Sequence, residues 1–486
     1  MKKWMMMVAV LAACFIWGCG TAEETADRTG EPAAESGEQA GAESFGESVF
    51  AEESKTAQEE EEPTFLETEE TQETEKVPQE EEKQALRPKV KGIFVTGAMA
   101  GTANMDHLID LVDRTELNTL VIDIKDDEGR VVCDVDLPLV NEIGAVRHYV
   151  KDMPGLVRKC KEKGIYLIAR IVTFKDPFLA EAKPEWSLHN TDGSIFRDKG
   201  GLAWVNPYEK QVWDYLLSIA EAAVDLGFDE VQFDYIRFST DSGMKNVDFG
   251  PETGERSRQD VITEFTAYAS DALHRMGAAV SADVYGVVID SETDRQIVGQ
   301  DYYELTKYLD AVSPMVYPSH YGPYNYNIPV PDAQPYDTVL AAMQASRKVL
   351  AGLDPRQRGP VSGNGVSEND VSGNDVSGND VSQDSGAESG QAAVWSTEEI
   401  AALAPDGEVR AVVRPWLQDF TATWVKGHIK YGPEQVRDQI RAVYDAGYEE
   451  WILWNAANRY TEGGLYGPDG EPLPGETEET AEEGGT

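Results

Sequence analysis

The segment DEVQFDYIRF, residues 229–238, is an apolar run that carries a carboxylate, a tyrosine and a guanidinium to its own end. Its branched and aromatic residues predict a buried strand. A charge in such a strand needs a partner or a chemical task, because an unpaired ion in a dry interior is costly. Asp234 is therefore either a catalytic carboxylate or one half of an internal ion pair with Arg237.

Apolar runs of this kind recur along the chain, and stretches of helical periodicity separate most of them. The runs lie at 92–95, 119–124, 165–172, 230–238, 279–285, 311–317, 409–417 and 451–454, and helices are expected at 105–113, 145–163, 211–225, 257–276 and 433–446. Buried strands that alternate with helices indicate a parallel sheet. Eight such units predict an α/β chain with a single (β/α)8 TIM barrel, since no Gly-x-Gly-x-x-Gly turn follows the first strand.

The start of the chain predicts export. Lys2 and Lys3 precede an apolar run that ends before Cys19, so residues 1–19 are typical of a lipoprotein signal peptide with Cys19 as the lipidated residue. An uncleaved signal anchor is the alternative. Either form is expected to hold the protein by the membrane, on its extracytoplasmic face.

The composition divides the chain after residue 19 into segments of different character. Residues 20–88 are Glu-rich and predict a disordered acidic tether, residues 89–466 form the barrel, and residues 467–486 predict a disordered acidic tail. A Val-Ser-Gly-Asn-Asp repeat marks a low-complexity insertion at 355–394, whose five-residue period does not match calcium-binding nonapeptides. The net charge of −46 argues against nucleic acid as a partner, since phosphate binding needs clustered Lys and Arg.

A barrel carries its site at the carboxyl ends of its strands, and here those ends are rich in carboxylates and aromatic rings. Period-two alternation lets Asp123 share the inner face with Lys125, and Gln232 with Asp234. Asp283 would lie there on the next strand.

Paired carboxylates with aromatic walls suit glycoside hydrolysis, which needs one protonated acid and one carboxylate about 5–5.5 Å apart in retaining enzymes. We expect Asp234 to be the nucleophile or oxocarbenium stabiliser, kept ionised by Arg237 or Arg170, and Asp283 to be the acid/base. Asp419 and Asp123 are the reserve candidates for either role.

Other polar and aromatic side chains near the strand ends are candidates for substrate binding. These are Lys125, Arg170, Arg237, Tyr317, His320, Trp416, Gln418, Trp454 and Asn455. Several have a structural alternative: Arg237 and Lys125 could form ion pairs that line the mouth, the tryptophans could pack against helices, and the histidine could belong to a surface loop.

The chain resembles the glycoside hydrolase domains of bacterial exported proteins, distant relatives of the α-amylase-like barrels. The resemblance rests on DIKD at 123–126, ARIVTFKD at 169–176, WVNP at 204–207, FDYIRF at 233–238, SPMVYPSHY at 313–321, RPWLQDF at 414–420 and WNA at 454–456. It implies a TIM barrel whose fourth-strand aspartate is the nucleophile. The fifth-strand acid of such barrels is usually glutamate, and Asp283 is shorter.

No cofactor or metal is expected, because the six histidines are scattered without metal-ligand spacing. Cys133 and Cys160 could form a disulfide in an exported protein or remain as two buried thiols. The predicted function is a surface-anchored glycoside hydrolase acting on a polysaccharide or oligosaccharide. The alternative is a carbohydrate-binding or wall-scaffolding barrel without catalysis.

Overall fold

The computed structural model describes residues 87–359 and 394–471. The predicted signal peptide with Cys19, nearly all of the tether, the centre of the insertion and most of the acidic tail lie outside these residues. In the part that is described, no helix combines the length and apolar character needed to cross a membrane.

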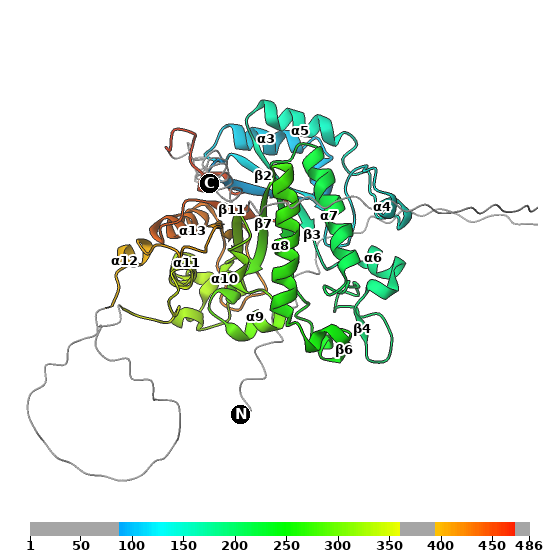
Figure 1. Ribbon diagram of the computed structural model, residues 1–486. Helices are drawn as coiled ribbons and strands as arrows, with labels where there is room; N and C mark the ends of the chain where they lie inside the picture. Colours follow the sequence, from blue (N-terminus) through cyan, green and yellow to red (C-terminus); the bar gives the residue numbers. More distant parts are fainter. Residues whose placement is uncertain (1–86, 360–393, 472–486) are drawn as a thin grey trace, which may run out of the picture. The chain divides into compact units, whose positions relative to one another are not determined.

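Parallel strands close into a barrel that helices surround (Figure 1). The barrel strands, in chain order, are β1 (Lys91–Val95), β2 (Thr119–Lys125), β3 (Tyr166–Val172), β5 (Glu230–Asp234), β7 (Ala279–Tyr285), β8 (Ala311–Met315), β9 (Val412–Val413), β10 (Trp416–Gln418) and β11 (Trp451–Trp454). Consecutive strands pair with each other except β9 and β10, which both pair with β8. β10 then pairs with β11, and β11 pairs with β1, so the barrel closes. The predicted (β/α)8 barrel is confirmed.

The seventh strand of the barrel is built from two short pieces. β9 pairs with the start of β8, and β10 with its end. Arg414 and Pro415 separate the two pieces, and the proline has no N–H to donate to a ladder. The predicted run at 409–417 is therefore one strand with a break in it.

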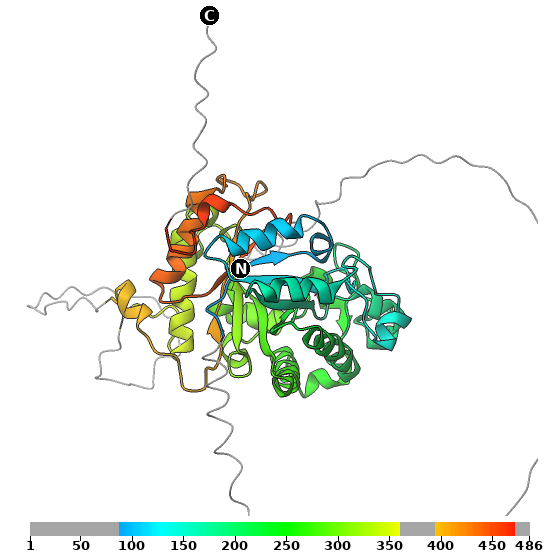
Figure 2. The same ribbon diagram turned by 90° about the horizontal axis from the view of Figure 1, so that it is seen from above.

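The helices cover the outside of the barrel. They are α2 (Gly97–Ala100), α3 (Met105–Asp113), α4 (Pro138–Glu142), α5 (Met153–Glu162), α6 (Pro177–Ala182), α7 (Lys210–Asp225), α8 (Arg258–Met276), α9 (Glu292–Val298), α10 (Tyr302–Leu305), α11 (Pro335–Leu350), α12 (Thr397–Ala401) and α13 (Pro433–Asp445). Seen from above, α11 and α13 pack side by side, and α7 and α8 form a second pair (Figure 2). A small antiparallel sheet, β4 (His189–Asn190) with β6 (Val247–Asp248), joins the loops after β3 and β5.

Two predicted boundaries differ from the structure for local reasons. The strand predicted at 230–238 ends at Asp234, because Tyr235 takes a left-handed φ of 50° that no strand continues through. The helix predicted at 145–163 begins only at Met153. Asp152 caps it by accepting from the Gly155 N–H, and Pro154 occupies its first turn.

Alternation sends the two faces of the strands into different cores. Val231 and Phe233 of β5, and Val280 and Ala282 of β7, pack outward in the large apolar core beneath the helices. The inner face carries a smaller apolar cluster of Val90, Phe94, Val121, Ile168, Tyr317, Trp416 and Ile452. Buried polar side chains share this interior with it, including those of Gln232, Asp234 and Asp283.

Candidate active site

Arg170, in β3, is the centre of a buried charge cluster at the carboxyl end of the barrel. Its Nη1 donates to Asp123 Oδ1 at 2.5 Å, and its Nε and Nη2 donate to Asp234 Oδ2 at 3.0 and 2.5 Å. The guanidinium lies over the rings of Phe94 and Trp454, with centroid distances of 5.3 and 5.5 Å. We call Arg170, Asp123, Asp234 and Asp283 the mouth cluster.

Asp234 ends β5 with both carboxylate oxygens engaged. Arg170 holds Oδ2, and the backbone N–H of Tyr235 donates to Oδ1 at 2.6 Å. The left-handed backbone at Tyr235 turns that N–H back onto the preceding side chain, a conformation that a bulky residue adopts only when its surroundings enforce it. The Asp234 side chain is thus fixed by an N–H donor on each of its oxygens.

Asp283 lies on β7, next to β5. Phe233 and Ala282 are register partners, so the two aspartates follow the paired positions on adjacent strands. Burial raises the pKa of Asp283 well above its usual value, and the charge of Asp234 raises it further. Trp416 opposes the shift by donating from Nε1 to Asp283 Oδ1 at 2.6 Å. Asp283 is therefore suited to carry a proton in this site.

Asp123 shares Arg170 with Asp234. Burial raises its pKa to about 7, although the charge and hydrogen bond of Arg170 act in the opposite direction. Its side chain contacts the same guanidinium as Asp234, so it belongs to the cluster and helps to fix the arginine.

A second arginine cluster lies in the barrel interior near the amino ends of the strands. Arg414 Nη1 donates to Glu230 Oε1 at 2.7 Å, and its Nε donates to Glu450 Oε2 at 2.9 Å. Ser281 and Tyr166 also donate to Glu230. We call Arg414, Glu230 and Glu450 the floor cluster. Sequence reasoning did not select it, although a glutamate at the start of a buried strand and an arginine inside a strand were visible signals.

Two predicted substrate-binding cations, Lys125 and Arg237, bind groups other than Asp234 and Asp283. The register of β2 shifts between Asp123 and Lys125, so the expected alternation fails there, and Lys125 binds the Val172 carbonyl oxygen and Asp176 instead. Arg237 stacks against Tyr285 at 4.5 Å and Tyr235 at 4.9 Å from the ring centroids, and its Nη1 donates to the Phe238 carbonyl. Arg170, and not Arg237, is the arginine on Asp234.

The aromatic candidates divide by depth. Trp416 is 1% exposed and orients Asp283, so it offers no open face for stacking. Trp454 is partly buried and stacks on Phe94 with centroids 4.1 Å apart. Tyr317 is buried close enough to Asp283 and Asp234 for their charges to raise its pKa, after the larger effect of burial. His320 packs edge-on against Tyr317, and burial lowers its pKa to about 4, so its ring is neutral at physiological pH.

The remaining polar candidates connect loops to one another. Gln418 donates to Asp332 and accepts from the Ser319 N–H, and Asn455 donates to the carbonyls of Asp419 and Arg459. The carboxylate of Asp419 accepts from the N–H and hydroxyl of Thr461 at 2.7 and 2.5 Å. Asp419 is thus tied to the loop after β11 and does not join Arg170.

Cys133 and Cys160 are buried free thiols, and burial raises the pKa of each to about 11. Among the described residues, no group of three or more His, Cys, Asp or Glu side chains is arranged to hold a metal ion.

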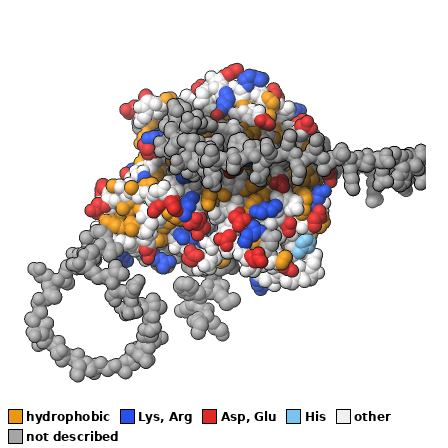
Figure 3. All heavy atoms as spheres, in the orientation of Figure 1, with side chains coloured by type: hydrophobic (Ala, Val, Ile, Leu, Met, Phe, Trp, Pro, Cys, Tyr) orange, Lys and Arg blue, Asp and Glu red, His pale blue; other side chains and the backbone are white. Residues whose placement is uncertain are grey.

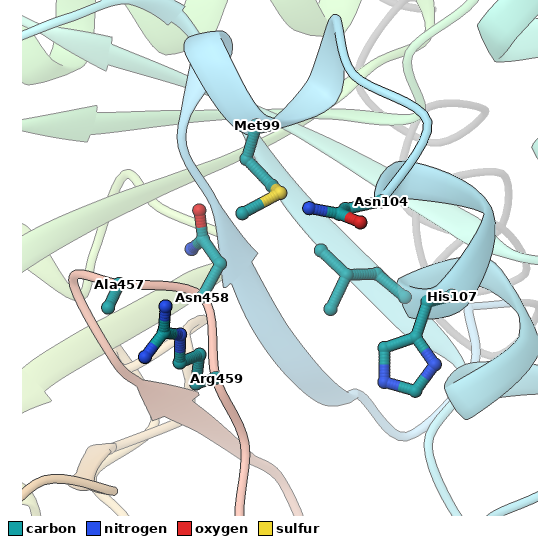
Figure 4. Close-up of a pocket in the computed structure, with 7 residues that line it drawn as sticks. Met99, Asn104, His107, Ala457, Asn458 and Arg459 are labelled. Atoms are coloured by element: carbon teal, nitrogen blue, oxygen red, sulfur yellow. The ribbon is translucent and has the colours of Figure 1, made fainter.

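A cavity of about 190 Å³ lies beside the carboxyl ends of β1 and β11 (Figure 4). Met99, Asn104 and His107, from α2 and the start of α3, face the loop that carries Asn458 and Arg459. None of the four mouth-cluster residues lines this cavity, and Asn458, which does, donates to the Phe94 carbonyl and accepts from the Thr96 hydroxyl.

Residues 92–361 and 383–460 match the model of one family, described as "Putative glycosyl hydrolase domain". No protein with a curated description matches the chain.

Several solved structures are similar. A hypothetical protein from Ruminiclostridium thermocellum is 40% identical over 40% of this chain and 97% of its own, with a TM-score of 0.37. The glycoside hydrolase domain of PgaB (BpsB) from Bordetella bronchiseptica is 12% identical, with a TM-score of 0.50 over 78% of this chain and 99% of its own. The α-galactosidase TtGalA from Thermus thermophilus is 11% identical, with a TM-score of 0.40 over 76% of this chain and 59% of its own. The likeness to the Bordetella domain concerns the fold alone.

Proposed function

This chain belongs to the family of glycosyl hydrolase domains, and we propose that it cleaves glycosidic bonds of a polysaccharide by a two-carboxylate mechanism at the mouth cluster. The observation that carries the proposal is the contrast between two neighbouring carboxyl groups. Asp234 receives N–H donors on both oxygens, and burial beside that charge raises the pKa of Asp283. Opposed environments of this kind assign an acid and a base within one site.

In the proposed reaction, Asp283 transfers its proton to the glycosidic oxygen as the bond to the anomeric carbon breaks. The Asp234 carboxylate stabilises the positive charge that develops on the sugar, either by covalent attack or through space. Water completes the hydrolysis and returns a proton to Asp283. Arg170 positions Asp234 throughout, since two of its nitrogens donate to one oxygen.

Neighbouring side chains would serve the substrate without changing charge. The pKa of Tyr317 is raised by burial and by the two aspartates, so its hydroxyl stays neutral and can hydrogen-bond a sugar. The His320 ring is neutral too, because burial lowers its pKa to about 4. Tyr317 lies beside the two aspartates, and His320 packs against Tyr317, so both could hydrogen-bond a sugar that reaches the proposed acid.

The test is a screen of the full chain against purified polysaccharides, scored by released reducing ends. The protein should release product from at least one polymer, and Asp234→Asn should release none from that polymer while still binding it. Retention of polymer without product from either protein would instead support the carbohydrate-binding barrel and overturn the catalytic proposal.

The anchored location is part of the same proposal and is supported by the sequence alone. Cys19 follows an apolar run that starts with two lysines, as expected of a lipidated export signal. Cells fed a labelled fatty acid should label the parent protein and not Cys19→Ala, which should appear in the medium or keep its leader. Equal labelling of both proteins would contradict the assignment of Cys19.

A further inference from the structure

The loop after β10, residues 420–432, exposes an aromatic ring near the mouth of the barrel. Trp424 is 49% exposed and stacks on Phe420, with ring centroids 5.9 Å apart and planes 22° from parallel. An indole held open to solvent on a second ring presents a flat apolar face. Sugar rings have apolar faces of similar size.

A continuous series of rings joins this surface to the aspartates. Phe420 packs edge-on against Tyr317 at 6.1 Å, and Tyr317 lies within electrostatic reach of Asp283 and Asp234. Tyr317, Phe420 and Trp424 thus form a path from the buried carboxylates to the surface. This path gives a polymer that enters the mouth a direction in which aromatic contacts continue outward.

The same loop is basic in an acidic protein. Residues 420–432 include Lys426, His428 and Lys430 but no Asp or Glu, whereas the chain has a net charge of −46. All three basic side chains are exposed, and neither lysine forms an ion pair with any residue that the structure describes. On the face drawn in Figure 3, acidic and basic side chains are intermingled. Other basic side chains have acidic partners, as Lys210 and Arg256 do in Glu264.

The loop is also held in place before any ligand arrives. Its Ile429 N–H donates to one carboxylate oxygen of Asp332, and its Tyr431 hydroxyl donates to the backbone carbonyl of the same residue, which is fully buried in the loop after β8. Gln418 donates to the other carboxylate oxygen of Asp332, so both oxygens of this acid are used to hold the loop in place. A fixed loop loses less conformational entropy on binding.

We propose that residues 420–430 bind an anionic glycan, with sugar rings on Trp424 and Phe420 and its carboxylate or phosphate groups beside Lys426 and Lys430. The inference rests on the proposed function for the direction in which the glycan runs and adds the class of substrate. An anionic membrane surface would also meet the lysines, but it would make no use of the ring path into the barrel.

The experiment measures binding by the full-length Asp234→Asn protein, so that hydrolysis cannot interfere. The probes are polygalacturonate, a glycerol-phosphate polymer, hydroxyethyl cellulose as a neutral glycan, and vesicles of anionic lipid. We expect tight binding to at least one of the two charged polymers, weakened by salt, and none to the neutral polymer. The better charged polymer distinguishes carboxylate from phosphate recognition.

Variants then locate the binding. Replacing Lys426 and Lys430 by Gln should weaken binding to the charged polymer about tenfold, and Trp424→Ala by about two- to tenfold. Replacing the same lysines by Arg should preserve binding. The matched control replaces Lys151 and Lys199, exposed lysines in the loops after β2 and β3, by Gln and should leave the affinity unchanged.

The proposal is overturned if neither charged polymer binds, if the double Gln variant binds as tightly as its parent, or if only vesicles bind. These outcomes differ from a failure of the proposed function. A barrel that binds the charged polymer through this loop and never cleaves it would lose the catalytic assignment and keep the glycan site.

Discussion

The barrel interior holds two clusters that each contain one arginine and several carboxyl groups. They differ in how many carboxyl groups share the arginine. In the floor cluster, Arg414 binds Glu230 and Glu450, and further donors from Ser281 and Tyr166 complete the set. The mouth cluster adds a third carboxyl group, Asp283, to the pair that Arg170 binds. One guanidinium cannot neutralise three buried carboxylates, so the pKa of Asp283 rises with its burial and with the charge of Asp234.

The difference shows how one fold separates stability from chemistry. The floor cluster lies at the amino ends of the strands and the mouth cluster at their carboxyl ends, where barrel enzymes carry their sites. A closed ion-pair set at the floor fixes the strands. In the proposed mechanism, the additional carboxyl group at the mouth, Asp283, holds the proton that the substrate takes.

The largest effect is expected when the mouth loses the charge on Asp234. Asp234→Asn keeps the shape of the side chain but cannot form or stabilise the charged transition state, so kcat should fall on the order of 10⁴-fold. Arg170 keeps its bond to Asp123, so the melting temperature should change little. Steady-state assays and calorimetry on the same sample check both statements, and an active variant would remove Asp234 from the mechanism.

The floor should respond in the opposite way. Arg414→Met leaves Glu230 and Glu450 in the interior without their shared cation, which should lower the free energy of unfolding by about 3–5 kcal/mol. Denaturant titration measures the loss, and kcat of the folded fraction should stay near that of the parent. A stable Arg414→Met protein with low kcat would show that the floor takes part in catalysis.

A moderate effect is expected in the pH dependence of stability. The pKa of Asp123 is about 7 in the fold and 3.8 without it, so the folded state binds more protons between these values. The contribution of Asp123 to the free energy of unfolding is fully present below about pH 4. It is lost as the pH rises through about 7, at up to about 1.4 kcal/mol per pH unit. Asp123→Asn should flatten that slope, as followed by denaturant titrations across the range, and an unchanged slope would exclude Asp123 as its source.

The smallest effect concerns Trp416. Its hydrogen bond lowers the pKa of Asp283, so Trp416→Phe should raise that pKa and move the alkaline decline of activity to higher pH. In the proposed mechanism, activity needs Asp283 protonated and falls as the pH rises through its pKa. A pH–rate profile taken well below the melting temperature checks the direction, and a move to lower pH would contradict the assigned acid.

Sequence periodicity predicted the barrel because buried strands and amphipathic helices repeat with distinct periods. It also brought Asp234 and Asp283 to adjacent strands. It could not predict which arginine binds Asp234, because Arg237 is close in sequence but follows the left-handed turn at Tyr235. Nor could it predict the partner of Lys125, since one irregular residue in β2 changes the direction of the side chains that follow.

The role of Trp416 was beyond sequence reasoning for a different reason. A tryptophan in an apolar strand indicates burial, but the acceptor of its single N–H donor, Asp283, lies 133 positions away in the sequence. The floor cluster joins Glu230 to Arg414 across a separation of 184 positions in the same way. Only closure of the barrel brings such pairs together.

The most direct test of the account is the protonation state of Asp283 at neutral pH, measured without any substrate. An infrared difference spectrum between the parent protein and Asp283→Asn isolates the carbonyl stretch of that single carboxyl group. The account predicts a protonated carboxylic acid band in the parent protein, absent from Asp283→Asn and retained in Asp123→Asn. A carboxylate band from Asp283 in its place would contradict the claim that the mouth cluster holds a proton for catalysis.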